Sequence, residues 1–301
     1  MVKKNTLRVW TRKVFGTSWK NILFNVINYL IFLLFTLVML YPFLYVLKKS
    51  LESTVLVDGV PQLRFSFASY WVVLQDKEIV RSFITTVIVL VVKVAVQLTI
   101  EMMMAYALSK FYLKGRKLIN LLLLITMLFS GGMIPSYILI TQVLQWRNNF
   151  LVYIIPGAIA AYDVFVIKSF LQGIPSALEE AAMLDGANSF VIFSKIYLPL
   201  CGPIIATIGL WAGVGLWNNW MTGVLYITDS EKRLFQQLLR DILITASSSD
   251  ASGMGGNDKI MAMADNVKMA TVIIGIIPIV VIYPFVQKYF VKGMLTGSVK
   301  G

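Results

Sequence analysis

The sequence predicts an all-α polytopic membrane protein with six transmembrane helices, and three observations support this fold class. Of the 301 residues, 58% are hydrophobic and only 14% are charged, and the mean hydropathy is +0.77. Six long apolar runs are nearly free of charge, and each is long enough for the roughly 20 helical residues that cross a bilayer core. Lys and Arg are also distributed unevenly among the loops between these runs. Together these features argue against one or two soluble domains.

Charge-free runs place the six predicted helices in order along the chain. The first run follows a basic N-terminus, as a signal peptide would, but it is too long for one and lacks a small-residue cleavage site. The second run is long and apolar, although it carries two charges of its own. The six helices are expected within 21–47, 82–108, 118–146, 150–171, 196–228 and 269–287.

The net charge of +12 is first an orientation signal. Of the 27 Lys and Arg residues, 15 lie at the two termini and in the loops around 110–117 and 168–195, and 11 lie in the loops on the other side. By the positive-inside rule, both termini are expected in the cytoplasm. We therefore expect contact with membrane lipid and none with nucleic acid. The segment 246–258 is rich in Ser, Gly and Asp, which predicts a flexible extracytoplasmic loop tip.

The composition disfavours enzymatic chemistry. The chain has no histidine and a single cysteine, Cys201, so it lacks His-based catalysis, the commonest zinc ligand and any internal disulfide. A phosphate-binding Walker A loop is also missing: the nearest approach, in 252–259, has Asp258 where the pattern needs Gly. We expect no catalytic residue, metal or cofactor in this chain, so any ATP would have to be hydrolysed by another one.

The loop before the fifth predicted span departs from the charge pattern. It lies on the side that should be basic, yet it contains Glu179, Glu180 and Asp185 with only Lys195 to offset them. An acidic surface in this place suggests a protein partner rather than lipid.

The local sequence predicts a short helix in this loop. Ser176 and Glu179 have the spacing of a capping box, with each side chain bonding to the other residue's amide. Gly186 suits the left-handed position that ends a helix, after which a second helix can run from Asn188 until Pro199. Alanines leave the first helix with little side-chain bulk, so another protein could approach it closely.

Several motifs resemble those of a known family. Glu180-Ala181-Ala182, three residues, Gly186, nine residues, Ile196, one residue, Leu198-Pro199 resembles the EAA signature of bacterial ABC importer permeases at every fixed position. Further similarity to the maltose-type sugar branch lies elsewhere in the chain, and it is greatest to the subgroup that serves oligosaccharides released from complex polysaccharides. These further motifs are Tyr41-Pro42-Phe43, Ala105-Tyr106-Ala107 and Tyr283-Pro284-Phe285.

The resemblance implies a type I importer in the bacterial cytoplasmic membrane. Such an importer has two permease subunits, here expected to form a heterodimer with a second homologous permease, two cytoplasmic ATPase subunits that bind ATP and Mg, and an extracytoplasmic solute-binding protein. The permease core would span 81–291, with the EAA loop at 174–199. Residues 1–80 would form a cytoplasmic N-terminus, the first span and an extracytoplasmic loop, and 292–301 a cytoplasmic tail. In 297–301, a contact with the ATPase and a loose tail stay equally open.

Carried over residue by residue, the EAA loop would couple to the ATPase. The resemblance implies that Glu180, Ala181, Ala182 and Gly186 sit in an ATPase cleft, with Glu179 and Asp185 meeting basic groups there. The motif ends at Leu198 and Pro199, which close the expected coupling region.

Polar residues inside the predicted spans are candidates for the translocation path. Lys93, Gln97 and Glu101 recur every four residues on the second span, so they form one stripe that should avoid lipid. The stripe could face the path or the partner permease, or it could be a buried pairing network. Asp163 could serve the same path or pair with Lys93. Asn218 is the best candidate for a substrate-facing amide, whereas aromatic residues near it fit an interfacial belt.

These observations predict a permease subunit of an ATP-driven oligosaccharide importer that works by alternating access. Two alternatives remain: an ABC permease for peptides or amino acids, and a self-contained ion-coupled transporter that uses Lys93, Glu101 and Asp163 as a charge relay. The second differs in needing neither an ATPase nor a binding protein.

Overall fold

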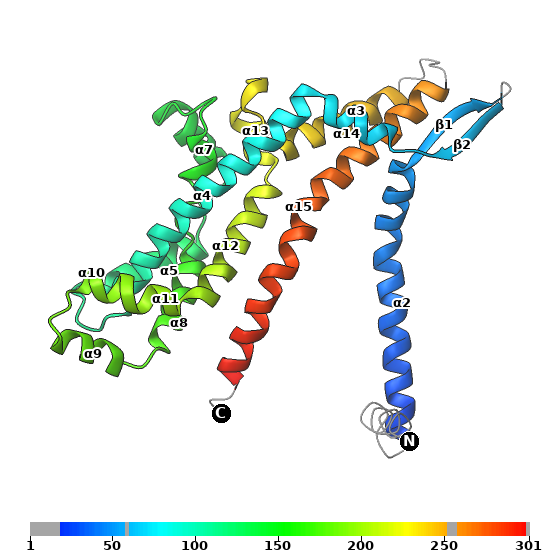
Figure 1. The fold of residues 1–301 in the computed structure, drawn as a ribbon. Helices are drawn as coiled ribbons and strands as arrows, with labels where there is room; N and C mark the ends of the chain where they lie inside the picture. The colour runs from blue at the N-terminus through cyan, green and yellow to red at the C-terminus, as the bar shows by residue number, and fades with distance from the viewer. Residues whose placement is uncertain (1–18, 58–59, 252–257, 299–301) are drawn as a thin grey trace. The chain divides into compact units, whose positions relative to one another are not determined.

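A computed structural model describes residues 19–57, 60–251 and 258–298, and within these ranges the chain is mostly helical (Figure 1). It divides into two compact units, which are considered separately. The elements are α2 (Trp19–Ser50), β1 (Glu52–Val57), β2 (Val60–Phe65), α3 (Ala68–Gln75), α4 (Lys77–Ser109), α5 (Arg116–Leu128), α6 (Met133–Ile138), the π-helix η1 (Leu139–Val143), α7 (Leu151–Ile154), α8 (Ala161–Gln172), α9 (Ala177–Leu184), α10 (Ser189–Ile192), the π-helix η2 (Phe193–Tyr197), α11 (Leu198–Leu200), α12 (Gly202–Trp217), α13 (Met221–Tyr226), the 3₁₀ helix η3 (Ser230–Lys232), α14 (Phe235–Ala251) and α15 (Asp258–Ser298).

The first unit comprises 1–70 and 256–273, and its described part contains α2, a hairpin and the beginning of α15. Strands β1 and β2 pair antiparallel, with Glu52 opposite Phe65. The all-α expectation is wrong for this hairpin, although the Asp58-Gly59 pair followed by the alternating residues 62–67 is a hairpin signal. The Asn266 side-chain amide donates to the Glu52 carbonyl oxygen at 2.8 Å, which ties the hairpin to α15.

The second unit comprises 71–255 and 274–301 and is organised around α4. This 33-residue helix packs against α8 and α12, and near its beginning against α14. Asp76 caps its N-terminus by accepting from the amides of Glu78 and Ile79 at 2.8 and 3.1 Å. Within this unit α9, α10 and α11 lie at one end, and α7 and α13 lie at the other (Figure 1).

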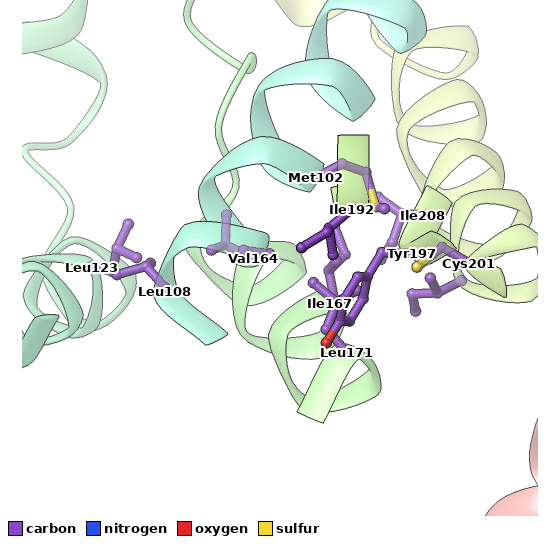
Figure 2. Packing of buried hydrophobic residues seen from close by; sticks show 12 residues of the cluster. Met102, Leu108, Leu123, Val164, Ile167, Leu171, Ile192, Tyr197, Cys201 and Ile208 are labelled. Atoms are coloured by element: carbon purple, nitrogen blue, oxygen red, sulfur yellow. The ribbon is translucent and has the colours of Figure 1, made fainter. Parts of the chain in front are cut away.

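A hydrophobic core joins α4 and α8 to the helices that follow α9. It consists of buried side chains from α4, α5, α8, α10, η2 and α12, with Val164, Ile167 and Ile192 fully enclosed. Figure 2 shows Ile167, Ile192 and Tyr197 converging between the ribbons of these helices. The core therefore holds the α9 end of the second unit together independently of any partner.

The helices of the described residues account for some, but not all, of the six predicted spans. Three helical stretches are long and apolar enough to cross a membrane: Asn21–Ser50, Lys77–Ser109 and Asp265–Phe285. Two bent pairs raise the number to five, Arg116–Leu128 with Met133–Val143 at 109° and Ser189–Leu200 with Gly202–Trp217 at 79°. The expected span in 150–171 is instead interrupted between α7 and α8.

Two local predictions about helix ends are wrong. The helix after Asn188 does not stop at Pro199 but continues through α11 to Leu200, because the fixed φ of proline, about −65°, is compatible with a helix. The chain turns two residues later, at Cys201. The expected loop tip at 246–258 is helical as far as Ala251, where α14 ends; residues 252–257 are outside the described part, as is most of the near-match to a Walker A loop.

Candidate functional site

The candidate site is the segment 174–199, which contains α9 and the arm formed by α10, η2 and α11. Its first helix ends as the sequence predicts: Gly186 has φ +81°, in the left-handed region that favours glycine. The Gly186 amide donates to the Met183 carbonyl oxygen at 3.0 Å, and the Ala187 amide donates to that of Ala182 at 2.9 Å. This is a Schellman motif, which fixes the direction in which the chain leaves α9. Any Cβ at Gly186 would meet open space, so the requirement for glycine comes from the backbone alone.

The arm after Gly186 begins with a side-chain cap. The Asn188 carboxamide oxygen accepts from the Val191 amide at 2.9 Å and so satisfies one of the free donors at the helix start. Along the arm, Ile196 packs against the core, whereas Leu198 and Pro199 are exposed. The end of the sequence motif therefore lies on the outer side of the arm.

The beginning of α9 differs from the prediction. The capping box is wrong, because Ser176 makes no side-chain cap and is itself helical, with φ −62° and ψ −27°. The Glu179 carboxylate instead binds two residues distant in sequence, Lys110 and Tyr197. Its Oε2 lies 2.5 Å from Lys110 Nζ and 2.7 Å from the Tyr197 hydroxyl. A buried ammonium offers a stronger partner than a backbone amide, so the tertiary contact replaces the local one.

The two faces of α9 have different surroundings. Glu179 and Ala182, three residues apart, face inward, and Ala182 packs against the core. Glu180, Ala181, Asp185 and Gly186 are exposed, and Leu184 is 90% exposed. Among the described residues, the carboxylates of Glu180 and Asp185 have no ion-pair partner. The exposed face thus presents two free acids and an apolar side chain to a partner.

The polar stripe on α4 lies in a hydrogen-bonded network with α8. Lys93 Nζ donates to Gln97 Oε1 at 2.8 Å, and Gln97 Nε2 donates to Glu101 Oε1 at 3.0 Å and to Asp163 Oδ2 at 3.2 Å. Glu101 Oε1 also accepts from the Ala160 amide at 2.8 Å. The structure therefore brings together four of the five candidate path residues, three of them buried and Lys93 half-buried.

Asn218, the fifth candidate, lies apart from this network. It is exposed at the C-terminal end of α12, immediately after the buried Trp217. The Trp217 indole donates to the Gly275 carbonyl oxygen at 3.0 Å, which gives this tryptophan a structural partner. No metal-binding group of three or more Cys, Asp and Glu residues is present in the part of the chain that the structure describes.

Three residues of the site were missed from sequence: Lys110, Tyr197 and Tyr106. Lys110 was counted only as one more positive charge, yet it is buried at the end of α4. Tyr197 lies inside the EAA motif between two fixed positions, and Tyr106 lies within the Ala105-Tyr106-Ala107 motif. The position of the two tyrosines within family motifs was the available signal, but nothing in the spacing of the three residues indicated that they meet.

Comparisons with known proteins match nearly the whole chain. A family model described as the inner membrane component of binding-protein-dependent transport systems matches residues 10–296. The polygalacturonan/rhamnogalacturonan transport system permease protein YtcP of Bacillus subtilis strain 168 is 40% identical over 291 residues, which cover 94% of this chain and 100% of that protein. Protein LplC of the same strain is 38% identical over 266 residues, 86% of this chain and 89% of its own length.

A solved structure agrees with these sequence relatives. A chain of a bacterial ABC transporter involved in the import of the acidic polysaccharide alginate superposes with a TM-score of 0.80 at 29% identity, covering 91% of this chain and 99% of that one. The resemblance inferred from the EAA signature is thereby confirmed. The chain belongs to the family of inner membrane components of binding-protein-dependent transport systems, the permease subunits of ABC importers.

Proposed function

We propose that this chain is one of two permease subunits of an ATP-driven importer that takes up an oligosaccharide delivered by a solute-binding protein. The exposed acidic face of α9 is the observation that carries the proposal, because it stands free at one end of the second unit in a chain of this family. The relatives belong to transport systems for polygalacturonan/rhamnogalacturonan and for alginate, which supports an oligosaccharide as the cargo.

In this proposal α9 is the coupling helix that docks on a cytoplasmic ATPase subunit. Glu180 and Ala181, followed by Asp185 and Gly186, would lie at the docking surface, and Leu198 and Pro199 would border it. Ala182, which belongs to the same motif, would support this surface from the inner side of α9, where it packs against the core. ATP and Mg would be bound by the two ATPase subunits. Closure of the ATPase pair would move α9 and drive alternating access between this permease and a second, homologous one.

The membrane arrangement is part of the same proposal. We infer six spans with both termini in the cytoplasm of a bacterium, counting α7 and α8 together as a broken fourth span. Lys93, Gln97, Glu101, Asp163 and Asn218 remain candidates for the translocation path. The bonds among the first four also fit a structural role, since such a network keeps charges away from lipid.

Docking and transport can be tested together with the complete transporter in proteoliposomes. We expect uptake of an oligosaccharide to require ATP inside, where the ATPase lies, and the binding protein outside. Glu180→Lys should abolish co-purification of the ATPase, because it reverses the charge of an exposed docking residue. Glu231→Lys is the matched control: it reverses a carboxylate that is 75% exposed at its side chain and makes only a surface ion pair, so the ATPase should stay bound. Uptake that follows an ion gradient without ATP or the ATPase would contradict the proposal.

A further inference from the structure

Glu179 is the one acid of the α9 segment that is turned into the protein. Its side chain is 13% exposed, that of its partner Lys110 is 9% exposed, and their charged atoms lie 2.5 Å apart. Because both charges are largely removed from water, separating them would leave either one uncompensated, which is far more costly than breaking a surface pair. The contact is therefore a fixed attachment of α9 and leaves Glu179 unavailable to an ATPase.

Two tyrosines enclose the ion pair. Lys110 Nζ donates to the Tyr197 hydroxyl oxygen at 3.1 Å, and that hydroxyl donates to Glu179 at 2.7 Å, so the three groups form a closed hydrogen-bonded ring. The same ammonium lies 4.3 Å from the centroid of the Tyr106 ring and 4.2 Å from that of Tyr197, within reach of cation–π attraction. Helix α4 contributes two residues to the cluster, whereas α9 and η2 contribute one each, so Glu179 is the point at which the cluster holds α9.

The cluster connects three elements that are far apart in sequence. Lys110 is the C-cap of α4, Glu179 lies in the first turn of α9, and Tyr197 ends η2. Helix α4 then continues without a break to the other end of the unit. There the Thr86 hydroxyl accepts from the Phe235 amide at 2.8 Å, and Arg81 donates to the Ser230 carbonyl oxygen at 3.2 Å.

We infer that Lys110 and Glu179 are positioning residues that transmit movement of the coupling helix into α4. A force on the exposed face of α9 would reach the end of α4 through the buried ion pair, and α4 would carry it as a continuous helix to the segments around Ser230 and Phe235. Of the three acids in the segment, Glu180 and Asp185 serve docking, whereas Glu179 serves transmission. This inference rests on the proposed function, because it requires an ATPase that acts on α9.

The test measures docking and transmission separately in the complete transporter. Glu179→Gln keeps the shape of the side chain and removes its charge, and Lys110→Met keeps the length of the stem and removes the ammonium. We expect both variants to retain the ATPase on purification and to hydrolyse ATP, but to take up roughly three- to tenfold less oligosaccharide per ATP than the wild type. Combining them should lower this ratio no further than the more severe single change, because both remove the same link.

Two further variants keep the outcome interpretable. Glu180→Gln, the adjacent acid on the exposed face, should give the opposite pattern of weakened ATPase binding and an unchanged ratio in the complexes that remain. Lys110→Arg keeps the charge and can stack on both tyrosines, so it should restore much of the ratio.

Three results would overturn the inference. If Glu179→Gln and Lys110→Met take up as much oligosaccharide per ATP as the wild type, the ion pair takes no part in transmission. Loss of the ATPase in Glu179→Gln but not in Lys110→Met would make Glu179 a docking residue. Loss of assembled permease in Lys110→Arg as well would make the cluster purely structural. Failure of the wild-type chain to bind an ATPase would instead contradict the proposed function itself.

Discussion

The charge on Glu179 depends on its two partners. Burial alone would raise the pKa of its carboxyl group, but the hydrogen bonds from Lys110 and Tyr197, together with the positive charge of Lys110, outweigh burial and hold the pKa below its ordinary value. The folded state therefore binds a proton at this group less readily than the unfolded chain does. Linkage then requires the ionised carboxylate to stabilise the fold.

Because the pKa of Glu179 is lowered in the folded protein, the stability of the fold should depend on pH. The stabilisation is fully present above the ordinary glutamate pKa of about 4.3 and is lost as the pH falls through the lowered value in the folded protein. We expect the purified permease to have a higher Tm than its Glu179→Gln variant at neutral pH, and the difference to shrink on acidification below about pH 4. Thermal unfolding in detergent across this range measures it. A difference that stays constant with pH would show that the carboxylate is not ionised in the fold.

For single residues, local sequence signals predicted the backbone conformation better than they predicted the partners of side chains. The left-handed position of Gly186 depends only on its own dihedral angles and its immediate neighbours, so the sequence was sufficient. The partner of Glu179 was predicted wrongly because Lys110 lies 69 residues away, and no local pattern encodes that contact. The contact between Gln97 and Asp163 joins residues 66 apart, and the sequence could only leave the role of each open.

Between elements, the side-chain amide of Gln97 adds a polar link to the apolar contact between α4 and α8. Its Nε2 group donates to carboxylates on both helices, and Glu101 Oε2 is buried without a partner among the described residues. Removing the amide would leave two carboxylates short of a donor in a place with little access to water. Gln97 therefore stabilises the contact between these two helices by keeping both carboxylates hydrogen-bonded.

Replacing this amide should destabilise the protein without changing the apolar core. We expect Gln97→Leu to lower the free energy of unfolding by about 2–3 kcal/mol, since it removes hydrogen bonds to two charged groups. Thr99→Ala is the control, because Thr99 lies on the exposed side of the same helix and bonds only to the Ala95 carbonyl oxygen. Denaturant titration of both variants in detergent gives the comparison. Equal effects of the two substitutions would mean that the network contributes no stability.

The elements themselves were only partly predictable. Apolar runs located α2 and α4 to within about five residues at each end, because an uninterrupted apolar stretch of about 20 residues is itself the signal of a membrane-crossing helix. They did not reveal the interruption between α7 and α8 or the 79° bend at Cys201, since the apolar run continues across each of these positions in the sequence. The hairpin in the first unit was not predicted because its first strand, residues 52–57, lacks the alternation of apolar and polar residues that is typical of a strand.

For the whole molecule, sidedness is the property that connects structure to function. Cys201 is fully buried, and the chain contains no other thiol, so an introduced cysteine can be labelled without reaction of a native thiol. Both Leu184 and Glu231 are exposed; Leu184 lies on α9 at one end of the second unit (Figure 1), and Glu231 lies in η3 beside Arg81, near the beginning of α4. The proposed topology assigns Leu184 to the cytoplasm and Glu231 to the outside.

Labelling of intact cells with a membrane-impermeant maleimide tests this assignment. We expect Glu231→Cys to react directly and Leu184→Cys to react only after permeabilisation, because the bilayer blocks access to α9. The unsubstituted protein, with its buried thiol, should remain unlabelled in its folded state. Reaction of Leu184→Cys from the outside would reverse the proposed orientation and separate α9 from any cytoplasmic ATPase.

Burial of the Lys110–Glu179 pair also sets how ionic strength acts on this protein. Dissolved salt screens charges that face water over a Debye length of about 8 Å at physiological concentration, but it reaches enclosed charges much less. Attraction between Glu180 or Asp185 and a basic partner should weaken as the cytosol concentrates during osmotic stress, while the internal link keeps its strength. Rising salt would then weaken the binding of the ATPase to this permease while leaving the internal link intact. Such regulation would be reversible and would need no additional regulatory domain.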